Sequence, residues 1–148
     1  MTWDGDISQM GQLVERLSDL AEVPSRAAKR VSRDIAELIQ EEFDDGEDPY
    51  GDPWAPLAPA TIAKGRHAPP LTDTGKMRGS LRVAPMRGSG VAITIDHPAA
   101  PHQTGWDGTQ SKGPARPILP ARGELPPSWQ EAIENAVEQE IGRVRRRA

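Results

Sequence analysis

Apolar residues return every three or four positions in three parts of this chain, which is the spacing of one face of an α-helix. The first part covers residues 7–20 and carries Ile7, Met10, Leu13, Leu17 and Leu20. The second begins at Ser25, a residue type that caps helices, and runs to about Phe43. The third begins at Pro126 and carries Trp129, Ile133, Val137, Ile141 and Val144. The pattern therefore predicts two N-terminal helices and one C-terminal helix.

An alternation with a period of two replaces the helical spacing between residues 81 and 95. Apolar side chains stand at every second position on both sides of the turn-forming segment 87–90, namely Leu81, Val83, Val91, Ile93 and Ile95. This pattern predicts a β-hairpin with one half-buried face. Shorter signals predict a helical turn at 61–64, a capped short helix within 72–81 and a short edge strand at 117–120.

Two irregular segments separate these elements. Residues 44–70 hold six of the 15 prolines, so this stretch cannot form a long helix or a central strand. It also carries the aromatic and apolar residues Tyr50, Trp54 and Leu57. We therefore predict an ordered arm, stiffened by proline, that packs on another surface. Residues 104–116 are polar and rich in glycine, and we predict a flexible loop there.

The predicted elements indicate an α+β fold in a single domain over residues 1–148. N-terminal helices and a C-terminal helix pack on a small antiparallel sheet, with a long proline-rich loop. Leu, Ile, Val and Phe make up about 18% of the residues, below the level of roughly one fifth at which chains struggle to build a core. The net charge of -4 is too small to cause disorder. We expect a folded domain with a thin core that gains stability by burying surface against other subunits.

Composition excludes several classes of protein. The chain has no cysteine, which excludes disulfides, thiol chemistry and zinc sites built on cysteine. The first ten residues lack the basic and apolar regions of a signal peptide, and no apolar run approaches the ~18 residues of a membrane span. The mild acidity argues against free nucleic acid as the main partner. We expect a soluble protein that is made in the cytosol.

Residues with catalytic potential do not occur at a recognisable spacing. Asp96, His97 and His102 suggest a small hydrolase, but two prolines separate the histidines and no H-E-x-x-H motif is present. The chain has no nucleophile elbow, and the Gly75-Lys76 pair lacks the rest of a phosphate-binding loop. The sequence therefore predicts no catalytic residue, no cofactor and no metal site. A hydrolase that uses Asp96, His97 and His102 remains a rival hypothesis.

The longest run of like charge is acidic. Seven carboxylates and no basic residue occur within 41–52, namely Glu41, Glu42, Asp44, Asp45, Glu47, Asp48 and Asp52. Calcium prefers several carboxylates, but Gly46 and Pro49 do not fit the spacing of an EF-hand loop. We expect a solvated loop or a patch that faces a basic neighbour. Arginines cluster at the other end of the chain, at 143–147, where they suit a helix dipole. A nucleic-acid-binding module that uses these arginines is a second rival.

Four short motifs follow one another along the chain. They are DPYGDPWAPL at 48–57, LTDTGKMRGSL at 71–81, HQTG at 102–105 and RPILP at 116–120. Thr61 and Lys64 stand between the first two motifs. Together these residues resemble the phage virion morphogenesis, or tail completion, family of Mu-like phages and related prophages. The resemblance covers roughly residues 30–145.

The resemblance implies a non-enzymatic structural protein of the virion, which completes or terminates the phage tail at its head-proximal end and helps to join the head. Such a protein forms a homo-oligomeric ring, and the symmetry of the tail suggests a hexamer. Its expected partners are further copies of itself, the tail tube protein and the head–tail connector proteins, with transient contact to passing DNA and no membrane. It is expected in the virion, and in the host cytoplasm during assembly. A head–tail adaptor or neck protein is the neighbouring alternative.

A ring also predicts which residues meet across subunits, because a heterologous interface joins two different patches. We predict that the acidic loop 41–52 meets a basic zone on the next subunit that contains Lys64, Arg66, Lys76, Arg78, Arg82 and Arg87. The predicted interface residues are Tyr50, Trp54, Leu57, Asp44, Asp45, Asp48, Arg78 and Arg82. Trp54 is the expected apolar anchor. The alternative is that Trp54 covers the core of its own subunit.

Overall fold

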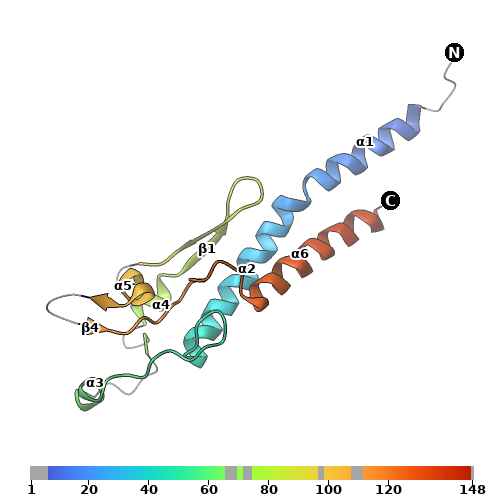
Figure 1. The fold of residues 1–148 in the computed structure, drawn as a ribbon. Helices are drawn as coiled ribbons and strands as arrows, with labels where there is room; N and C mark the ends of the chain where they lie inside the picture. The colour runs from blue at the N-terminus through green and yellow to red at the C-terminus, as the bar shows by residue number, and fades with distance from the viewer. Residues whose placement is uncertain (1–6, 66–69, 72–74, 97–98, 108–111, 148) are drawn as a thin grey trace.

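The computed structural model describes residues 7–65, 70–71, 75–96, 99–107 and 112–147. Two N-terminal helices, α1 (Ile7–Ala21) and α2 (Val23–Asp45), follow each other with only Glu22 between them and form one long rod (Figure 1). The C-terminal helix α6 (Pro127–Arg146) runs antiparallel beside α2. The three helices predicted from the apolar spacing are therefore confirmed.

The ends of α2 follow from its local sequence. The helix begins at Val23, and Pro24 lies in its first turn, where the missing N–H leaves no hydrogen bond unmade. The prediction that Ser25 caps this helix is therefore wrong. The helix ends at Gly46, whose φ of +68° lets its N–H donate to the Glu42 carbonyl oxygen at 2.8 Å.

An ion pair joins α2 to α6. Arg30 Nε donates to Glu140 Oε1 at 2.5 Å, and Arg30 Nη1 donates to Gln139 Oε1 at 2.9 Å. Glu140 is buried, and the hydrogen bond from Arg30 lowers the pKa of its carboxyl group. Arg30 and Glu140 can pair only in one register of α2 against α6. The ion pair therefore favours that register.

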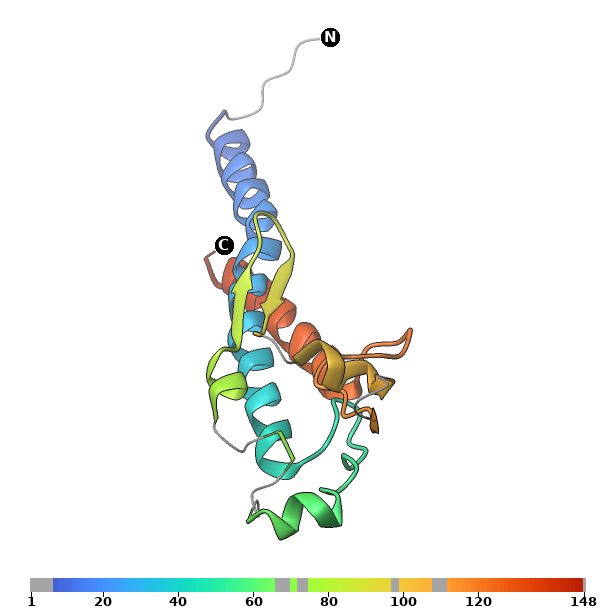
Figure 2. The same cartoon turned by 90° about the vertical axis from the view of Figure 1, so that its left-hand side faces the viewer.

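The β-hairpin predicted over 81–95 is confirmed. Strand β1 (Arg82–Pro85) pairs antiparallel with β2 (Val91–Thr94), and Val83 lies opposite Ile93. The hairpin and α6 lie on different sides of α2 (Figures 1 and 2). The core forms where these elements meet, and its buried members are Ala27, Val31, Ile35, Ile39, Phe43, Trp54, Met77, Leu81, Ile118, Trp129 and Ala136. Helices combined with a small antiparallel sheet confirm the predicted α+β class.

Several short elements complete the fold. Helices α3 (Pro59–Ala63) and α4 (Lys76–Gly79) confirm the short helices predicted near these positions, although residues 72–74, where a cap was expected, lie outside the described residues. Helix α5 (Ala99–Thr104) has no counterpart in the predictions. Strands β3 (Trp106–Asp107) and β4 (Lys112–Gly113) pair with each other, so the prediction of a flexible loop is wrong for these residues.

The edge strand predicted at 117–120 is also wrong. Pro117 and Pro120 have no backbone N–H with which to join a sheet. The N–H groups of Ile118 and Leu119 donate instead to the side chain of Gln103, at 2.8 and 2.9 Å. The segment is therefore held by a side chain and not by a neighbouring strand. None of the helices in the described part of the chain is both long enough and apolar enough to span a membrane.

Candidate assembly site

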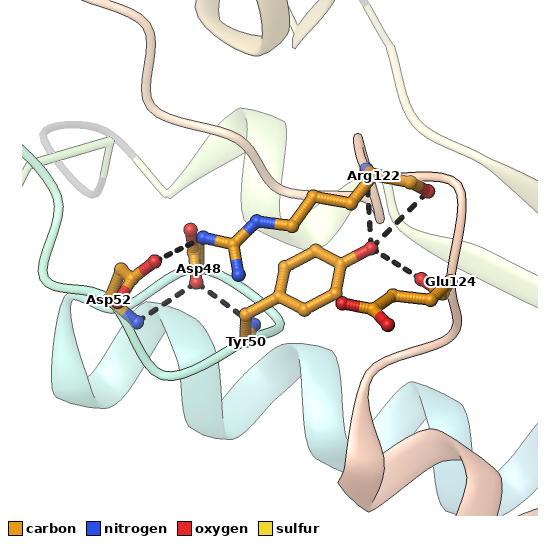
Figure 3. Close-up of polar contacts among 5 residues, drawn as sticks. All are labelled: Asp48, Tyr50, Asp52, Arg122 and Glu124. Atoms are coloured by element: carbon orange, nitrogen blue, oxygen red, sulfur yellow. Dashed lines mark hydrogen bonds and ion pairs between the residues drawn. The ribbon is translucent and has the colours of Figure 1, made fainter.

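The proline-rich arm begins with a compact loop that Asp48 organises. Asp48 Oδ1 accepts hydrogen bonds from the backbone N–H groups of Tyr50 at 2.9 Å and Asp52 at 3.0 Å (Figure 3). The Trp54 N–H then donates to the Gly46 carbonyl oxygen at 2.7 Å and closes the loop. Asp48 therefore stabilises its own loop, because both hydrogen bonds that this oxygen accepts come from backbone N–H groups of the loop.

Tyr50 fastens this loop to the turn before α6. Its hydroxyl donates to the Glu124 carbonyl oxygen at 2.7 Å and accepts from the Arg122 N–H at 3.2 Å (Figure 3). The Arg122 guanidinium lies 4.3 Å from the centre of the Tyr50 ring and forms an ion pair with Asp52. The tyrosine thus has its polar group and one ring face engaged within its own chain. A role of Tyr50 in an interface between subunits stays a prediction.

Trp54 is a core residue of its own subunit. Only 6% of it is exposed, and its ring meets Phe43 edge to face with centroids 5.6 Å apart. Its indole N–H donates to the Pro117 carbonyl oxygen at 2.8 Å. These contacts favour the alternative that Trp54 covers the core of its own subunit, because the loop closed at Gly46 turns the ring toward the end of α2. A role of Trp54 as an interface anchor stays a prediction. Leu57, further along the arm, is half-buried, and its place in an interface stays a prediction.

Arg116 binds the same arm from a second motif. Its guanidinium donates to the carbonyl oxygens of Ala55 at 2.7 Å and Pro56 at 2.9 Å. Its own backbone N–H donates to the His102 carbonyl oxygen at 2.7 Å. One arginine therefore ties the arm to the segment that follows α5.

Gln103 completes this arrangement, which we call the motif junction (residues 54–56, 102–103 and 116–119). Its Nε2 donates to the Leu119 carbonyl oxygen at 2.7 Å, while its Oε1 accepts from Ile118 and Leu119. Three of the four sequence motifs meet here through side chains that bind backbone atoms. The sequence shows the motifs but not their meeting, since the contacts span about 60 residues along the chain.

Replacing Gln103 by leucine should lower the free energy of unfolding by about 2 kcal/mol, because it leaves two partly buried N–H groups and one carbonyl without partners. Urea unfolding monitored by circular dichroism measures the loss. The matched control is Gln130→Leu on the exposed face of α6, where we expect a change below about 0.5 kcal/mol. Equal losses in the two variants would show that Gln103 does not hold the junction.

The acidic loop meets a basic residue of its own chain. Asp44 Oδ1 lies 2.7 Å from Arg78 Nη1, and Arg78 Nε also donates to Gln40 Oε1 at 2.5 Å. Arg82 donates to the carbonyl oxygens of Gly79 and Leu81. The prediction that acidic loop and basic zone pair only between subunits is wrong for Asp44 and Arg78, because α4 folds against the end of α2. A role of the exposed Asp45 in an interface stays a prediction.

One acidic residue of this run is buried. Glu42 is 8% exposed, and neither of its carboxyl oxygens has a hydrogen-bond partner among the described residues. Burial, with a smaller contribution from Asp48, raises the pKa of Glu42 to about 9, and the Trp129 indole N–H opposes this shift. The carboxyl group is therefore protonated at neutral pH. Beside it lies a hollow of about 310 Å³ that Glu41, Asp45, Glu47 and Asp48 also line.

Two of the three residues of the hydrolase hypothesis, Asp96 and His102, are among the described residues. His97 lies outside the described residues. The Asp96 backbone N–H donates to Ser80 Oγ at 2.9 Å, and burial together with Arg116 lowers the pKa of His102. Within the described ranges, no group of three or more His, Cys, Asp or Glu side chains is arranged to hold a metal ion.

Comparison with known proteins decides the family. The model of the phage virion morphogenesis family matches residues 6–145. The chain belongs to this family. The matched range begins one residue before α1 and ends one residue before the end of α6, so the motif junction and almost all of the long helices fall within the family domain. Neither a curated protein nor a solved structure matches the chain.

The virion morphogenesis domain leaves an apolar face of α1 uncovered. Leu13, Val14, Leu17 and Leu20 are exposed to 56, 60, 57 and 45%. The polar side chains Gln12, Glu15, Arg16 and Asp19 instead line a hollow with Val144 of α6 and Arg147, the residue that follows this helix. The helix thus turns its polar face toward its own chain and its apolar face toward solvent. The sequence shows this stripe, but the pattern alone does not say whether anything covers it.

The same morphogenesis domain has an apolar groove along α2. The groove has a volume of about 410 Å³. Its floor is the first half of α2, and its walls are β2 and the first half of α6. Its lining includes Ala27, Val31, Ile35, Val91, Ile93, Leu125, Trp129, Ile133 and Val137. A stripe and a groove of this kind are features of surfaces that other proteins cover.

Proposed function

We propose that this protein is a structural, non-enzymatic subunit that completes or terminates the phage tail at its head-proximal end and helps to join it to the head. It acts as a homo-oligomeric ring, with six subunits to match the symmetry of the tail. The tail tube protein lies on one side of the ring and the connector proteins of the head on the other. The observation that carries the proposal is the match of the virion morphogenesis family over residues 6–145.

The surface of the chain supports an assembly role. A subunit that worked alone would be expected to cover an apolar helix face, whereas here four large apolar residues of α1 are exposed. The groove along α2 is a second apolar surface at a different place on the domain. A head-to-tail ring requires two different contact surfaces on each subunit, and these two apolar surfaces meet that requirement.

Removal of the gene from its phage tests the proposal. We expect infected cells to accumulate filled heads and separate tails of abnormal length, and a plasmid copy of the gene to restore joined particles. Electron microscopy of particles that carry an epitope-tagged copy should place the label where the tail meets the head. Tails of normal length already joined to heads in the deletion strain would contradict the proposal. Tails of normal length that lack heads, with the label on the head side of the joint, would indicate a neck protein instead.

A further inference from the structure

The apolar stripe of α1, defined as Leu13, Val14, Leu17 and Leu20, is left exposed by the residues that the structure describes. Helix α1 continues the direction of α2, and the connecting Glu22 has helical dihedrals (φ -85°, ψ -11°). The groove of the same chain is lined along α2 by residues from Val23 to Ile35. Helix α2 runs away from α1 (Figure 1). To reach it, α1 would have to fold back by a half turn at a residue that is already helical. The stripe therefore requires a partner outside the chain.

We propose that the α1 stripe of one subunit lies in the apolar groove of the next subunit. The inference rests on the proposed ring and identifies the contact that closes it. Laying an apolar helix face into a groove is a common mode of recognition. The stripe and the groove are different patches of one surface, so their contact is heterologous and repeats around a ring.

The dimensions of the two surfaces agree. The groove floor extends from Val23 to Ile35, which is about 18 Å of helix at 1.5 Å per residue, whereas the 15 residues of α1 span about 22 Å. The groove volume of about 410 Å³ holds on the order of a dozen groups the size of a water molecule. That is room for the ends of several leucine side chains. The residues that line the groove are apolar apart from Ser89, so leucines seated there would cover few polar groups.

The area of one such contact is small for a stable pair of subunits. Half of the lateral surface of a helix about 22 Å long and 10 Å wide is on the order of 350 Å². A stable interface of standard size buries about 800 Å² on each partner. A single α1 contact is therefore less than half of what such an interface buries. In a ring each subunit makes the contact twice, once with its stripe and once with its groove, so two neighbours hold each subunit.

The first test changes the stripe where it cannot disturb the fold. Leu13→Gln combined with Leu17→Gln keeps good helix formers at exposed positions, so circular dichroism should remain that of the wild type. We expect self-association, measured by sedimentation alone and on purified tail tubes, to weaken by more than about tenfold. The matched control Ser18→Gln lies beside the stripe and should associate like the wild type. A double variant that forms rings like the wild type would overturn the inference while leaving the ring itself intact.

The second test uses the absence of cysteine from the chain. One protein carries Leu17→Cys in the stripe, and another carries Ser89→Cys in the hairpin wall of the groove. Mixing them with a short thiol cross-linker should give a covalent pair, whereas Glu15→Cys on the polar face of α1 should not. Rings that form without this cross-link would overturn the inference alone. A wild-type chain that stays monomeric both in solution and in the presence of tail tubes would overturn the inference and the ring. Monomers that bind tail tubes through the stripe would show that the stripe contacts the tube protein instead of a second subunit.

Discussion

Replacing Glu42 by glutamine should raise the free energy of unfolding by about 3 kcal/mol at pH 7. The pKa of this buried carboxyl group is about 9 in the folded protein, against 4.5 as its ordinary value. Folding at neutral pH therefore requires that Glu42 take up a proton, which costs free energy. Glutamine has nearly the shape of the protonated side chain and makes no such demand.

The pH dependence of this effect has a definite sign. Between pH 4.5 and 9 the folded chain holds a proton on Glu42 that the unfolded chain has released, so the contribution of Glu42 to the stability of the wild type falls as the pH rises. The advantage of Glu42→Gln should be small below pH 4.5 and grow by about 1.4 kcal/mol per pH unit up to pH 9. Glu140 does not interfere in this range, because its lowered pKa changes stability only at acidic pH.

Urea unfolding at several pH values between 5 and 9, at one protein concentration, measures the difference between the two proteins. Glu41→Gln is the matched control, since Glu41 is the exposed neighbour on the same helix. Its substitution should change stability by less than about 0.5 kcal/mol at every pH. A difference between Glu42→Gln and the wild type that stays constant from pH 5 to 9 would show that Glu42 is not protonated in the fold.

Replacing Trp54 by alanine should lower the free energy of unfolding by about 3–5 kcal/mol. The substitution removes the edge-to-face contact with Phe43, opens a cavity under the arm and leaves the Pro117 carbonyl oxygen without its donor. For a domain of this size the loss is a large part of the total stability. Circular dichroism and urea unfolding of the purified variant measure it.

Two further variants separate the contributions at this site. Trp54→Phe keeps an aromatic ring but loses the hydrogen bond to Pro117, so we expect a smaller loss of about 1–2 kcal/mol. Ile62→Ala changes an exposed apolar residue on the same arm and should cost less than about 1 kcal/mol. If Trp54→Ala remained as stable as Ile62→Ala but failed to assemble, the tryptophan would be an interface anchor after all.

The regular elements were predictable because each depends on residues that are close in sequence. The apolar stripes of α2 and α6 and the alternation around the hairpin turn each lie within one stretch of chain. The start of a helix is harder to predict where two signals compete. At the start of α2, Pro24 in the first turn outweighs Ser25 as a capping residue, and the helix begins at Val23.

Long-range bonds explain what the sequence did not predict. The segment 117–120 has the composition of a strand, but Gln103 supplies the hydrogen bonds that a strand would have used. Trp54 and Arg78 have the character of surface anchors, but Phe43 and Asp44 of the same chain are within reach. Only the folded arrangement brings these partners together. The motifs could therefore be found from sequence, whereas their shared role in one junction could not.

The motif junction also affects how this domain can diverge. Gln103 and Arg116 bind backbone oxygens and N–H groups of residues 55, 56, 118 and 119, and every amino acid except proline has both of these groups. Ile118 is fixed by its place in the core, but the side chains at 55 and 56 are then nearly free to change, while the two binding residues are not. Substitutions on the surface of the arm can thus adapt it to a new partner without altering the backbone hydrogen bonds that hold the arm in place.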